Sequence, residues 1–286
     1  MKLTTPTHLA PEKVLIVGLS GSGKSTLASK LATKFHLHWI DLERGAKVLY
    51  KLPKEAQDNV DVYRIPDSAS FPVGSQTMTQ LWKNGKMHIC HEHGAHNCAM
   101  CTKDAKPFDD LDFSKLSPTD IVVLDTGTQL SHSILAHVTR SQPIDYKPER
   151  DDWGALRKLT EFFCSQFQAS PVNLIVICHL TEAELTDGAT KLVPNFGSAS
   201  MSAEFSKAFD HVVYCEIKNG KYAAGSSGTY SPKVLTKSRT DFMIEKLPIP
   251  SLEPVFDGSH LANYDPQQDV RSPAQIALDN LKKQPK

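Results

Sequence analysis

The stretch KVLIVGLSGSGKSTLASKLATKF, Lys13 to Phe35, decides the fold. It opens on a short β-branched run and continues into a helical pattern that begins at Lys24. Between the two, Gly18 to Ser25 fits the phosphate-binding pattern G-x-x-x-x-G-K-[ST], in the strand-then-helix context that the motif requires. Glycines let backbone N–H groups turn around a phosphate, and the start of the helix adds its dipole. The stretch therefore predicts a nucleotide site in an α/β fold.

Each polar position of this loop has an expected role. Lys24 is expected to reach the β- and γ-phosphates, and the Ser25 hydroxyl to ligate Mg²⁺. The run IVVLDT supplies Asp125 as the Walker B carboxylate, which completes the protein part of the magnesium site. The expected cofactors here are ATP and Mg²⁺. The residues expected to bind the nucleotide are Gly18, Ser20, Gly21, Ser22, Gly23, Lys24, Ser25 and Thr26.

Short β-branched runs alternate with helical patterns along the chain. HWIDLE, VYRIP and IVVLDT follow the phosphate loop, and a helical pattern comes after each of them. Such alternation predicts a mostly parallel sheet between helices. Residues 152–169 carry apolar side chains at helical spacing, and NLIVICHL then reads as a buried strand. HVVYCEI, KVLTKSRT and DFMIEKL are joined by short turns, which predict antiparallel strands at one edge of the sheet.

The expected organisation is one large domain with short additions. Residues 1–12 are an N-terminal extension, residues 13–247 the ATPase domain, and residues 84–106 an insertion within that domain. From residue 248 onward, PIPSLEPVFDGSH predicts an extended Pro-rich linker, and SPAQIALDNLKKQ a helix in the tail that ends at residue 286.

The balance of charge excludes a global attraction to polyanions. The chain has 32 basic and 32 acidic side chains, so any nucleic-acid site must be a local patch. The start, MKLTTPTHLAPEK, lacks the apolar core of a signal peptide, and no apolar run is long enough to span a membrane. We therefore expect a cytoplasmic protein that does not bind a membrane.

The insertion contains HICHEHGAHNCAMC, which has the spacing of a zinc site. Two chelating pairs are joined by a short glycine-containing turn, which suits tetrahedral Zn²⁺. Thiolate and imidazole ligands disfavour magnesium and calcium. His91 or His96 could replace the histidine of the first pair. The expected ligands of a structural Zn²⁺ are Cys90, His93, Cys98 and Cys101.

The general base of hydrolysis has to come from outside the Walker B strand. Many AAA+ ATPases place a glutamate directly after the Walker B aspartate, but Thr126 occupies that position here. Glu43, at the carboxyl end of the strand HWIDLE, is the candidate, because ligands of a doubly wound sheet sit beyond the carboxyl ends of its strands. Strand alternation would put Asp41 on the same side, facing the γ-phosphate. A surface acid at a strand end is the alternative.

HWIDLERG resembles the Asp-x-Glu strand end of RecA-like recombinases, whose glutamate polarises the attacking water. NLIVICHL ends in His179, where RecA-like proteins carry a polar residue, usually glutamine, that senses the γ-phosphate. The polar segment TEAELTDGATKLVPNFGSAS then resembles their mobile DNA-contacting loop. In KVLTKSRTD, Lys237 and Arg239 match residues that reach the nucleotide of a neighbouring subunit as trans fingers.

From residue 13 to residue 247 the chain resembles the RecA-like ATPases of bacteriophages, often grouped in the AAA family, which include single-strand annealing recombination proteins. The landmarks are GLSGSGKST, DLERG, IVVLDTGTQL, DDWG, ICHL, DHVVYCEIKN and LTKSRTD. The resemblance implies a RecA-like core and ATP hydrolysis that depends on single-stranded DNA. It further implies a homo-oligomeric ring or filament, a single-strand-binding protein as a further partner, and the host cytoplasm as location. The implied catalytic residues are Lys24, Glu43, His179, Lys237 and Arg239.

Two other functions share the phosphate loop. GLSGSGKST also resembles the loops of adenylylsulfate and nucleoside kinases, although the chain has no clear arginine-rich lid and has a longer distal β region. A non-hydrolysing accessory of a phage replication complex could use the same core. Hydrolysis stimulated by single-stranded DNA, phosphoryl transfer to a metabolite, and nucleotide binding without turnover distinguish the three.

Overall fold

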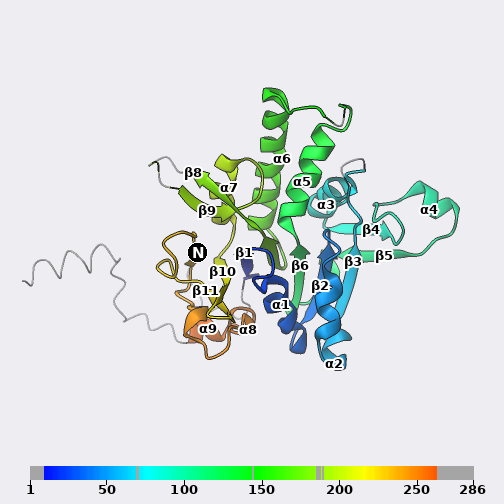
Figure 1. Cartoon of the computed structure of the whole chain (residues 1–286). Coiled ribbons are helices and arrows are strands. Elements are labelled where there is room, and N and C mark those ends of the chain that lie inside the picture. The colour runs from blue at the N-terminus through cyan, green and yellow to red at the C-terminus, as the bar shows by residue number, and fades with distance from the viewer. Residues whose placement is uncertain (1–9, 69–70, 144, 185–187, 189, 263–286) are drawn as a thin grey trace, which may run out of the picture.

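The computed structural model describes residues 10–68, 71–143, 145–184, 188 and 190–262. An eight-stranded sheet runs through it in the order β11-β10-β1-β7-β6-β2-β3, with β12 also paired to β10 (Figure 1). The six strands from β10 to β3 are parallel, whereas β11 and β12 pair with β10 in antiparallel fashion. The predicted mostly parallel sheet with antiparallel edge strands is confirmed. The strands are β1 Lys13–Gly18, β2 His36–Asp41, β3 Val60–Arg64, β6 Asp120–Asp125, β7 Asn173–Cys178, β10 His211–Lys218, β11 Lys221–Gly225 and β12 Lys237–Ser238.

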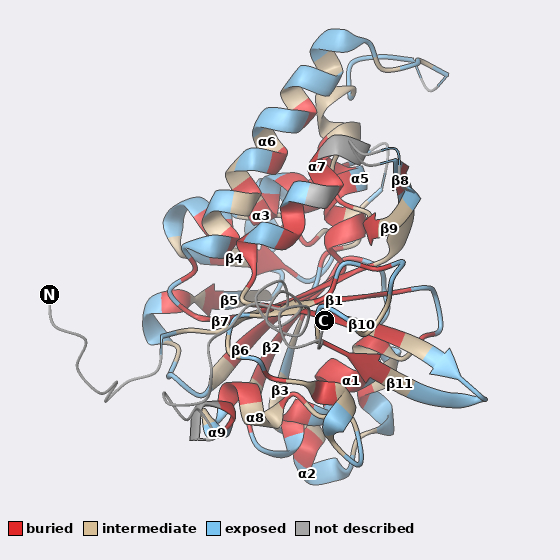
Figure 2. Ribbon diagram, turned by 90° about the vertical axis from the view of Figure 1, so that its left-hand side faces the viewer, coloured by how far each residue is buried: buried red, intermediate tan, exposed pale blue. Residues whose placement is uncertain are grey.

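Two hydrophobic clusters cover the two faces of this sheet. Within β1, Val14 and Ile16 belong to one cluster, and Leu15 and Val17 to the other. A strand that is buried on both faces needs apolar side chains at nearly every position, which is why its sequence reads as a continuous run. Figure 2 shows the strands of the sheet as largely buried between two layers of helices.

The helices divide between the two faces. One face carries α3 Val73–Asn84, α5 Gly127–Val138, α6 Arg150–Gln168, α7 Ala199–Phe205 and the 3-10 turn η4 Ser206–Ala208. The other carries α1 Lys24–Ser29, η1 Lys30–Thr33, η2 Ala46–Lys51, α2 Lys54–Gln57, η5 Ile244–Lys246 and α8 Glu253–Phe256. Helix α9 Ser259–Ala262 follows α8, and the 3-10 turn η3 Phe113–Lys115 precedes β6.

The long helix α6 confirms the prediction from apolar spacing. A capping box fixes its start, because the Glu149 and Asp152 side chains each accept a hydrogen bond from the other residue's backbone. Trp153 is the exception to the predicted apolar stripe, since 43% of it is exposed in the first turn. The buried side chains of the helix are Leu156, Thr160, Phe163 and Phe167.

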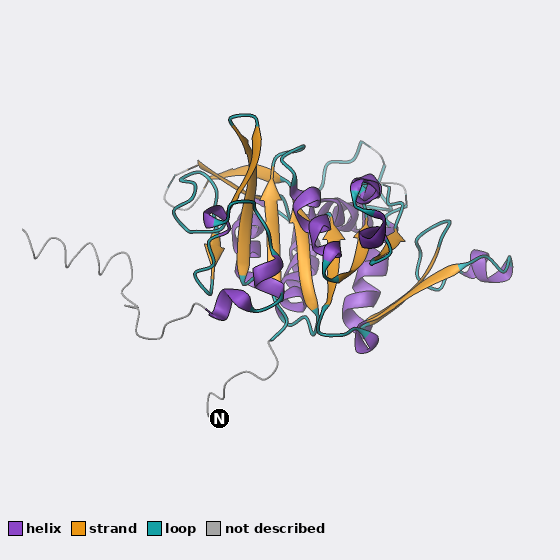
Figure 3. Cartoon of the chain, turned by 90° about the horizontal axis from the view of Figure 1, so that it is seen from below, coloured by secondary structure: helices purple, strands orange, loops and turns teal. Residues whose placement is uncertain are grey.

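Two small antiparallel sheets stand beside the main one. Strands β4 Lys86–Cys90 and β5 Phe108–Asp112, with α4 Ala99–Lys103 between them, project from the body of the molecule (Figures 1 and 3). Strands β8 Leu180–Glu184 and β9 Thr190–Pro194 form a hairpin directly after β7. The expected DNA-contacting loop is therefore paired strand over most of the residues described in this segment.

One strand prediction near the end of the domain is wrong, and one strand was missed. DFMIEKL contains the 3-10 turn η5 and no strand, whereas KYAAG forms β11 and pairs antiparallel with β10, as β12 of KVLTKSRT also does. Asn219 and Gly220 have φ of 53° and 73°, as a two-residue hairpin turn requires. This Asn-Gly pair, between HVVYCEIK and KYAAG, was the sequence signal for the strand.

The expected extended linker is also wrong for residues 248–262. Leu252, Val255 and Phe256 are buried against the face of the sheet that carries α1. Their spacing places them on one side of a single helical turn, which explains the packing. The expected tail helix, like most of the N-terminal extension, lies outside the described residues. Among the described helices, none combines the length and apolar character needed to cross a membrane.

Candidate active site

The register of the sheet brings four strand ends together. Asp41 of β2 pairs with Asp125 of β6, and Asp125 pairs with Ile177 near the end of β7. On the other side of β7, Val17 of β1 pairs with Cys178. The phosphate loop, the Walker B aspartate and the residues after β2 and β7 therefore share the carboxyl edge of the sheet, where ligands of such sheets bind.

The loop after β1 has the shape that its glycines predict. Gly21 and Gly23 have φ of 75° and 90°, in the left-handed region that other residues rarely adopt. A Cβ atom at Gly23 would also lie 2.9 Å from the Tyr222 ring. The Lys24 ammonium is 6% exposed and donates hydrogen bonds to the carbonyl oxygens of Gly18, at 3.0 Å, and Leu19, at 2.8 Å. Burial lowers the Lys24 pKa.

Asp125 and Ser25 fit a magnesium site. Asp125 is 2% exposed, and within the described part of the chain its Oδ2 atom has no hydrogen-bond partner. Burial raises the Asp125 pKa to about 7, and a hydrogen bond with the Ser25 side chain opposes this rise. A buried carboxylate oxygen without a partner beside a hydroxyl is the arrangement that a bound Mg²⁺ would satisfy. Asp125 and Ser25 would hold Mg²⁺ there, and the ion would supply positive charge against the phosphates of the nucleotide.

Glu43 lies two residues beyond β2 and is held by two contacts. Its Oε1 atom accepts a hydrogen bond from the Thr126 hydroxyl at 2.8 Å, and its Oε2 atom lies 3.5 Å from His179 Nε2. The hydrogen bond with His179 is the main cause that lowers the Glu43 pKa. The other ring nitrogen of His179 lies 3.5 Å from Lys24 Nζ. A continuous line of polar groups thus joins the phosphate-loop lysine to a carboxylate.

The His179 backbone is fixed as well. Its N–H donates to the Thr128 hydroxyl of α5 at 2.9 Å, so the ring is held directly after β7. Because β7 lies between β1 and β6 in the sheet, this ring sits between the phosphate loop and the Walker B strand.

A model of the AAA domain family matches residues 10–240. The chain belongs to the AAA domain family. No curated protein matches it. Among solved structures it is similar to a prototypical ATPase from the type III secretion system of pathogenic bacteria, with 15% identity and a TM-score of 0.39. That match covers 72% of this chain and 52% of the other, so the chain spans about half the length of that ATPase.

The AAA domain places Asp41 differently from the expected orientation toward the γ-phosphate. Its carboxylate accepts hydrogen bonds from the backbone N–H groups of Gly45, at 2.8 Å, and Ala46, at 3.2 Å. Strand β2 ends at Asp41, so strand alternation no longer relates it to Glu43. Asp41 fixes the turn that carries Glu43 and Arg44.

Lys237 and Arg239 are not brought to this edge of the AAA domain. Lys237 of β12 pairs with Val212, near the amino end of β10, whereas the phosphate loop begins beside Cys215 of the same strand. Arg239 Nη1 lies 3.1 Å from Asp210 Oδ1. Within one chain these two cations therefore lie away from the Lys24 side of the site.

The structure adds two residues to the expected set of the AAA domain. Thr126 binds Glu43 and also accepts a hydrogen bond from the Gln129 N–H at the start of α5. The signal for it was a hydroxyl directly after the Walker B aspartate. Tyr222 of β11 covers Gly23, and both residues line a cavity of about 130 Å³ whose lining also includes Ser22, Thr26 and the exposed Ile249. Its position next to the phosphate loop suits a nucleobase.

The cysteine and histidine cluster forms a compact group on the projecting sheet of the AAA domain. His93 Nδ1 lies 3.8 Å from the sulfur of Cys90, 3.6 Å from that of Cys98 and 3.2 Å from that of Cys101. Tetrahedral zinc with its usual bond lengths separates such ligands by about 3.5 Å. His91 instead lies 2.8 Å from Asp109, and His96 accepts a hydrogen bond from the His88 N–H. Of the three candidate histidines, only His93 joins the group.

Proposed function

We propose that this AAA domain is an ATPase that hydrolyses ATP in response to single-stranded DNA, as the resemblance to phage RecA-like proteins implies. The observation that carries the proposal is the position of Glu43, held by Thr126 and joined through His179 to the phosphate-loop lysine. A carboxylate with a lowered pKa is ionised, so it can accept a hydrogen bond from a water molecule and orient it, provided that the γ-phosphate lies next to it.

Each residue then has a part in the reaction. Glu43 orients water for in-line attack on the γ-phosphate, and Lys24 balances charge on the β- and γ-oxygens. Ser25 and Asp125 would hold Mg²⁺. His179 contacts both Lys24 and Glu43, so the arrival or departure of the γ-phosphate can change its position.

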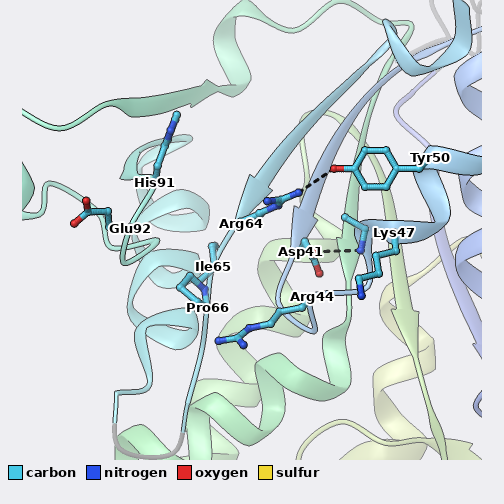
Figure 4. Close-up of a pocket in the computed structure, with 10 residues that line it drawn as sticks. Asp41, Arg44, Lys47, Tyr50, Arg64, Ile65, Pro66, His91 and Glu92 are labelled. Atoms are coloured by element: carbon cyan, nitrogen blue, oxygen red, sulfur yellow. Dashed lines mark hydrogen bonds between the residues drawn. The ribbon is translucent and has the colours of Figure 1, made fainter. Parts of the chain in front are cut away.

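A basic cavity next to Glu43 supports the DNA part of the proposal. The cavity has a volume of about 450 Å³ and lies between the turn after β2, the end of β3 and the projecting residues 86–112, which we call the metal-ligand module (Figure 4). Its lining includes three cations, Arg44, Lys47 and Arg64, and two carboxylates, Asp41 and Glu92. Asp41 binds backbone N–H groups and Glu92 pairs with Lys106, and no carboxylate in the described part of the chain lies within salt-bridge distance of the three cations. Cations without acidic partners are suited to bind phosphate groups.

Tyr50 gives this cavity the second feature of a single-strand site. It is 67% exposed, and its hydroxyl accepts a hydrogen bond from Arg64 at 3.3 Å (Figure 4). Single-stranded DNA is bound by basic grooves in which bases stack on aromatic rings, with weak sequence preference and strong salt dependence.

The cavity is also next to the catalytic carboxylate in sequence. Arg44 directly follows Glu43 and has a φ of 59°, in the left-handed region. A phosphate that binds Arg44 in the cavity would therefore act on the turn that positions Glu43. We propose this turn as the link between DNA binding and hydrolysis.

Assembly into a homo-oligomer completes the proposal. Leu19, Tyr222 and Ile249, all close to the phosphate loop, are 58%, 65% and 69% exposed. Exposed apolar side chains that gather at one place favour a subunit contact there. A neighbouring subunit would then supply Lys237 and Arg239 to the nucleotide in trans. We also propose that Cys90, His93, Cys98 and Cys101 hold a structural Zn²⁺, since four protein ligands leave no open position for catalysis.

The test is ATP hydrolysis measured against the concentration of single-stranded DNA at several salt concentrations. We expect Lys47→Glu with Arg64→Glu to raise the half-stimulating DNA concentration at least about tenfold, because both phosphate contacts reverse sign. Tyr50→Leu should weaken stimulation by about 1–3 kcal/mol for a stacked base. Lys51→Glu, exposed at the end of η2, is the matched control and should leave stimulation unchanged.

Three other results would contradict the proposal. Equal stimulation of the wild type and the Lys47→Glu, Arg64→Glu variant would place DNA elsewhere. Phosphoryl transfer to a nucleoside or other metabolite would favour the kinase. ATP binding without turnover, with and without DNA, would favour the accessory protein.

A further inference from the structure

We infer that Glu12, His211 and His260 form a second metal site, for a transition-metal ion such as Zn²⁺, at the amino edge of the main sheet. The three side chains come from separate parts of the chain: Glu12 precedes β1, His211 begins β10 and His260 lies in α9. This edge is opposite the phosphate loop, because His211 pairs with Val14 at the start of β1.

The ligand atoms already lie close to one another. His211 Nε2 is 3.3 Å from one Glu12 carboxylate oxygen, and His260 Nε2 is 3.8 Å from the other. The two rings have their centroids 5.7 Å apart at an angle of 80°. Zinc with ordinary bond lengths would separate two nitrogen or oxygen ligands by about 3.3 Å, so small movements would complete the site.

The tautomer of His260 favours a metal. Its Nδ1 atom lies 2.8 Å from the Pro254 carbonyl oxygen. A carbonyl can only accept, so Nδ1 carries the hydrogen and Nε2 of the neutral ring presents a lone pair toward Glu12. A lone pair that faces a carboxylate is repelled by it until a metal ion or a proton lies between them. A histidine whose other nitrogen donates to a backbone carbonyl is the usual form of a metal ligand.

The burial of His211 supplies the second observation. Its side chain is completely buried, and neither ring nitrogen has a hydrogen-bond partner within the described residues. The Nε2 atom of His260 also lacks one there. Buried polar atoms without partners are rare in native proteins, and an unseen ion is one of their usual causes. Phe242 packs against both rings, with centroids 6.2 Å and 6.3 Å away, and keeps the surroundings apolar.

The donor set selects the kind of ion. Two imidazoles and one carboxylate suit Zn²⁺ and its transition-metal neighbours, whereas calcium and magnesium prefer oxygen ligands. Water can take the fourth position of a tetrahedral ion. Bound there, the ion would join α9, and with it the packed segment from Leu252 to Phe256, to the first residues of the sheet.

Metal content per chain tests the inference, with variants that separate the two sites. The full chain is stripped with a chelator, refilled with Zn²⁺ and measured by elemental mass spectrometry. We expect about two ions per wild-type chain, one at each tetrahedral site. Cys98→Ser and His260→Ala should each lose one ion, and the double variant both. His132→Ala, which removes an exposed histidine of α5, should lose none.

A conservative variant and a Co²⁺ spectrum distinguish loss of the metal site from misfolding of the chain. Glu12→Gln keeps the size of the side chain and should weaken Zn²⁺ at this site at least about tenfold, with an unchanged circular dichroism spectrum. In the Cys98→Ser chain, Co²⁺ should bind without a thiolate charge-transfer band and be lost after His260→Ala. A wild type that holds a single ion, lost entirely in Cys98→Ser, would overturn the inference. So would a second ion that survives both Glu12→Gln and His260→Ala.

Discussion

The orientation of the Glu43 side chain depends on residues outside its own segment of the chain. HWIDLERG predicted a carboxylate beyond a strand end, and the structure places one there. Its orientation depends on Thr126 and His179, which lie 83 and 136 residues further along the chain. Strand alternation could not supply this, because β2 ends at Asp41 and the turn after it is held by that residue's carboxylate.

His179 should control the pH dependence of hydrolysis. Its hydrogen bond is the main cause of the lowered Glu43 pKa, and a lower pKa keeps the base charged to lower pH. His179→Ala removes this effect, so the Glu43 pKa rises and the acid limb of kcat/KM moves to higher pH. His179→Gln retains an N–H donor and should move it less. A pH profile of His179→Ala that matches the His132→Ala control would contradict this role.

Among the elements, α6 shows which features the spacing of apolar residues can predict and which it cannot. The spacing predicted the helix and its buried stripe, but not that Phe167 would be the centre of an aromatic cluster. One neighbouring ring, Phe163, belongs to α6 itself. The other rings come from α3, α7 and the segments around α7, which the sequence gives no means of bringing together. The rings within 6.3 Å of the Phe167 centroid are those of Trp82, Phe163, Phe196, Phe205 and Phe209.

Phe167→Ala should lower the free energy of unfolding by about 3–5 kcal/mol, because it leaves a cavity in a completely buried cluster. Phe162→Ala is the matched control, since the neighbouring ring on α6 is only partly buried and should cost clearly less. Urea denaturation followed by circular dichroism measures both. Equal losses would show that the cluster around Phe167 does not dominate this face of the sheet.

Without bound metal, the metal-ligand module is expected to unfold while the ATPase core stays folded. It projects from the body and has a short sheet of its own, and the Zn²⁺ proposed there would contribute to its folding energy beside the contacts of Met87, Ile89 and Leu111 with the main core. Cys98→Ser should speed amide hydrogen exchange across residues 86–112 and leave the strands of the main sheet protected. Cys164→Ser, on α6, is the control for loss of a thiol. Unchanged exchange in the Cys98→Ser module would rule out a structural metal there.

Over the whole molecule, the order of the strands could not be predicted from the sequence. Each apolar run predicts a strand, but several strand orders in the sheet are compatible with the same runs. The pairing between β1 and β7, for example, joins residues far apart in the chain. The same limit applies to KVLTKSRTD. Its basic residues were predicted to reach the nucleotide of a neighbouring subunit, and the sequence does not show that the pairing of β12 with β10 places them away from the site of their own chain.

Complementation between variants tests whether the site is shared between subunits. Glu43→Gln removes the base of one site, and Lys237→Ala with Arg239→Ala removes the proposed trans cations. If neighbouring chains complete each site, mixing the two inactive variants should restore measurable hydrolysis at interfaces that contain both intact halves. A mass measurement before and after mixing checks exchange of subunits. Exchange without restored hydrolysis would contradict action in trans.

The most direct test of the account is a comparison of ATP binding and ATP hydrolysis in the wild type and Glu43→Gln, with Glu55→Gln on α2 as control. A base that only activates water should leave the Kd for ATP within about threefold and lower kcat by about 10²–10⁴. Hydrolysis by Glu43→Gln at the wild-type rate, with ATP bound equally well, would contradict the assignment of Glu43 and the ATPase mechanism built on it.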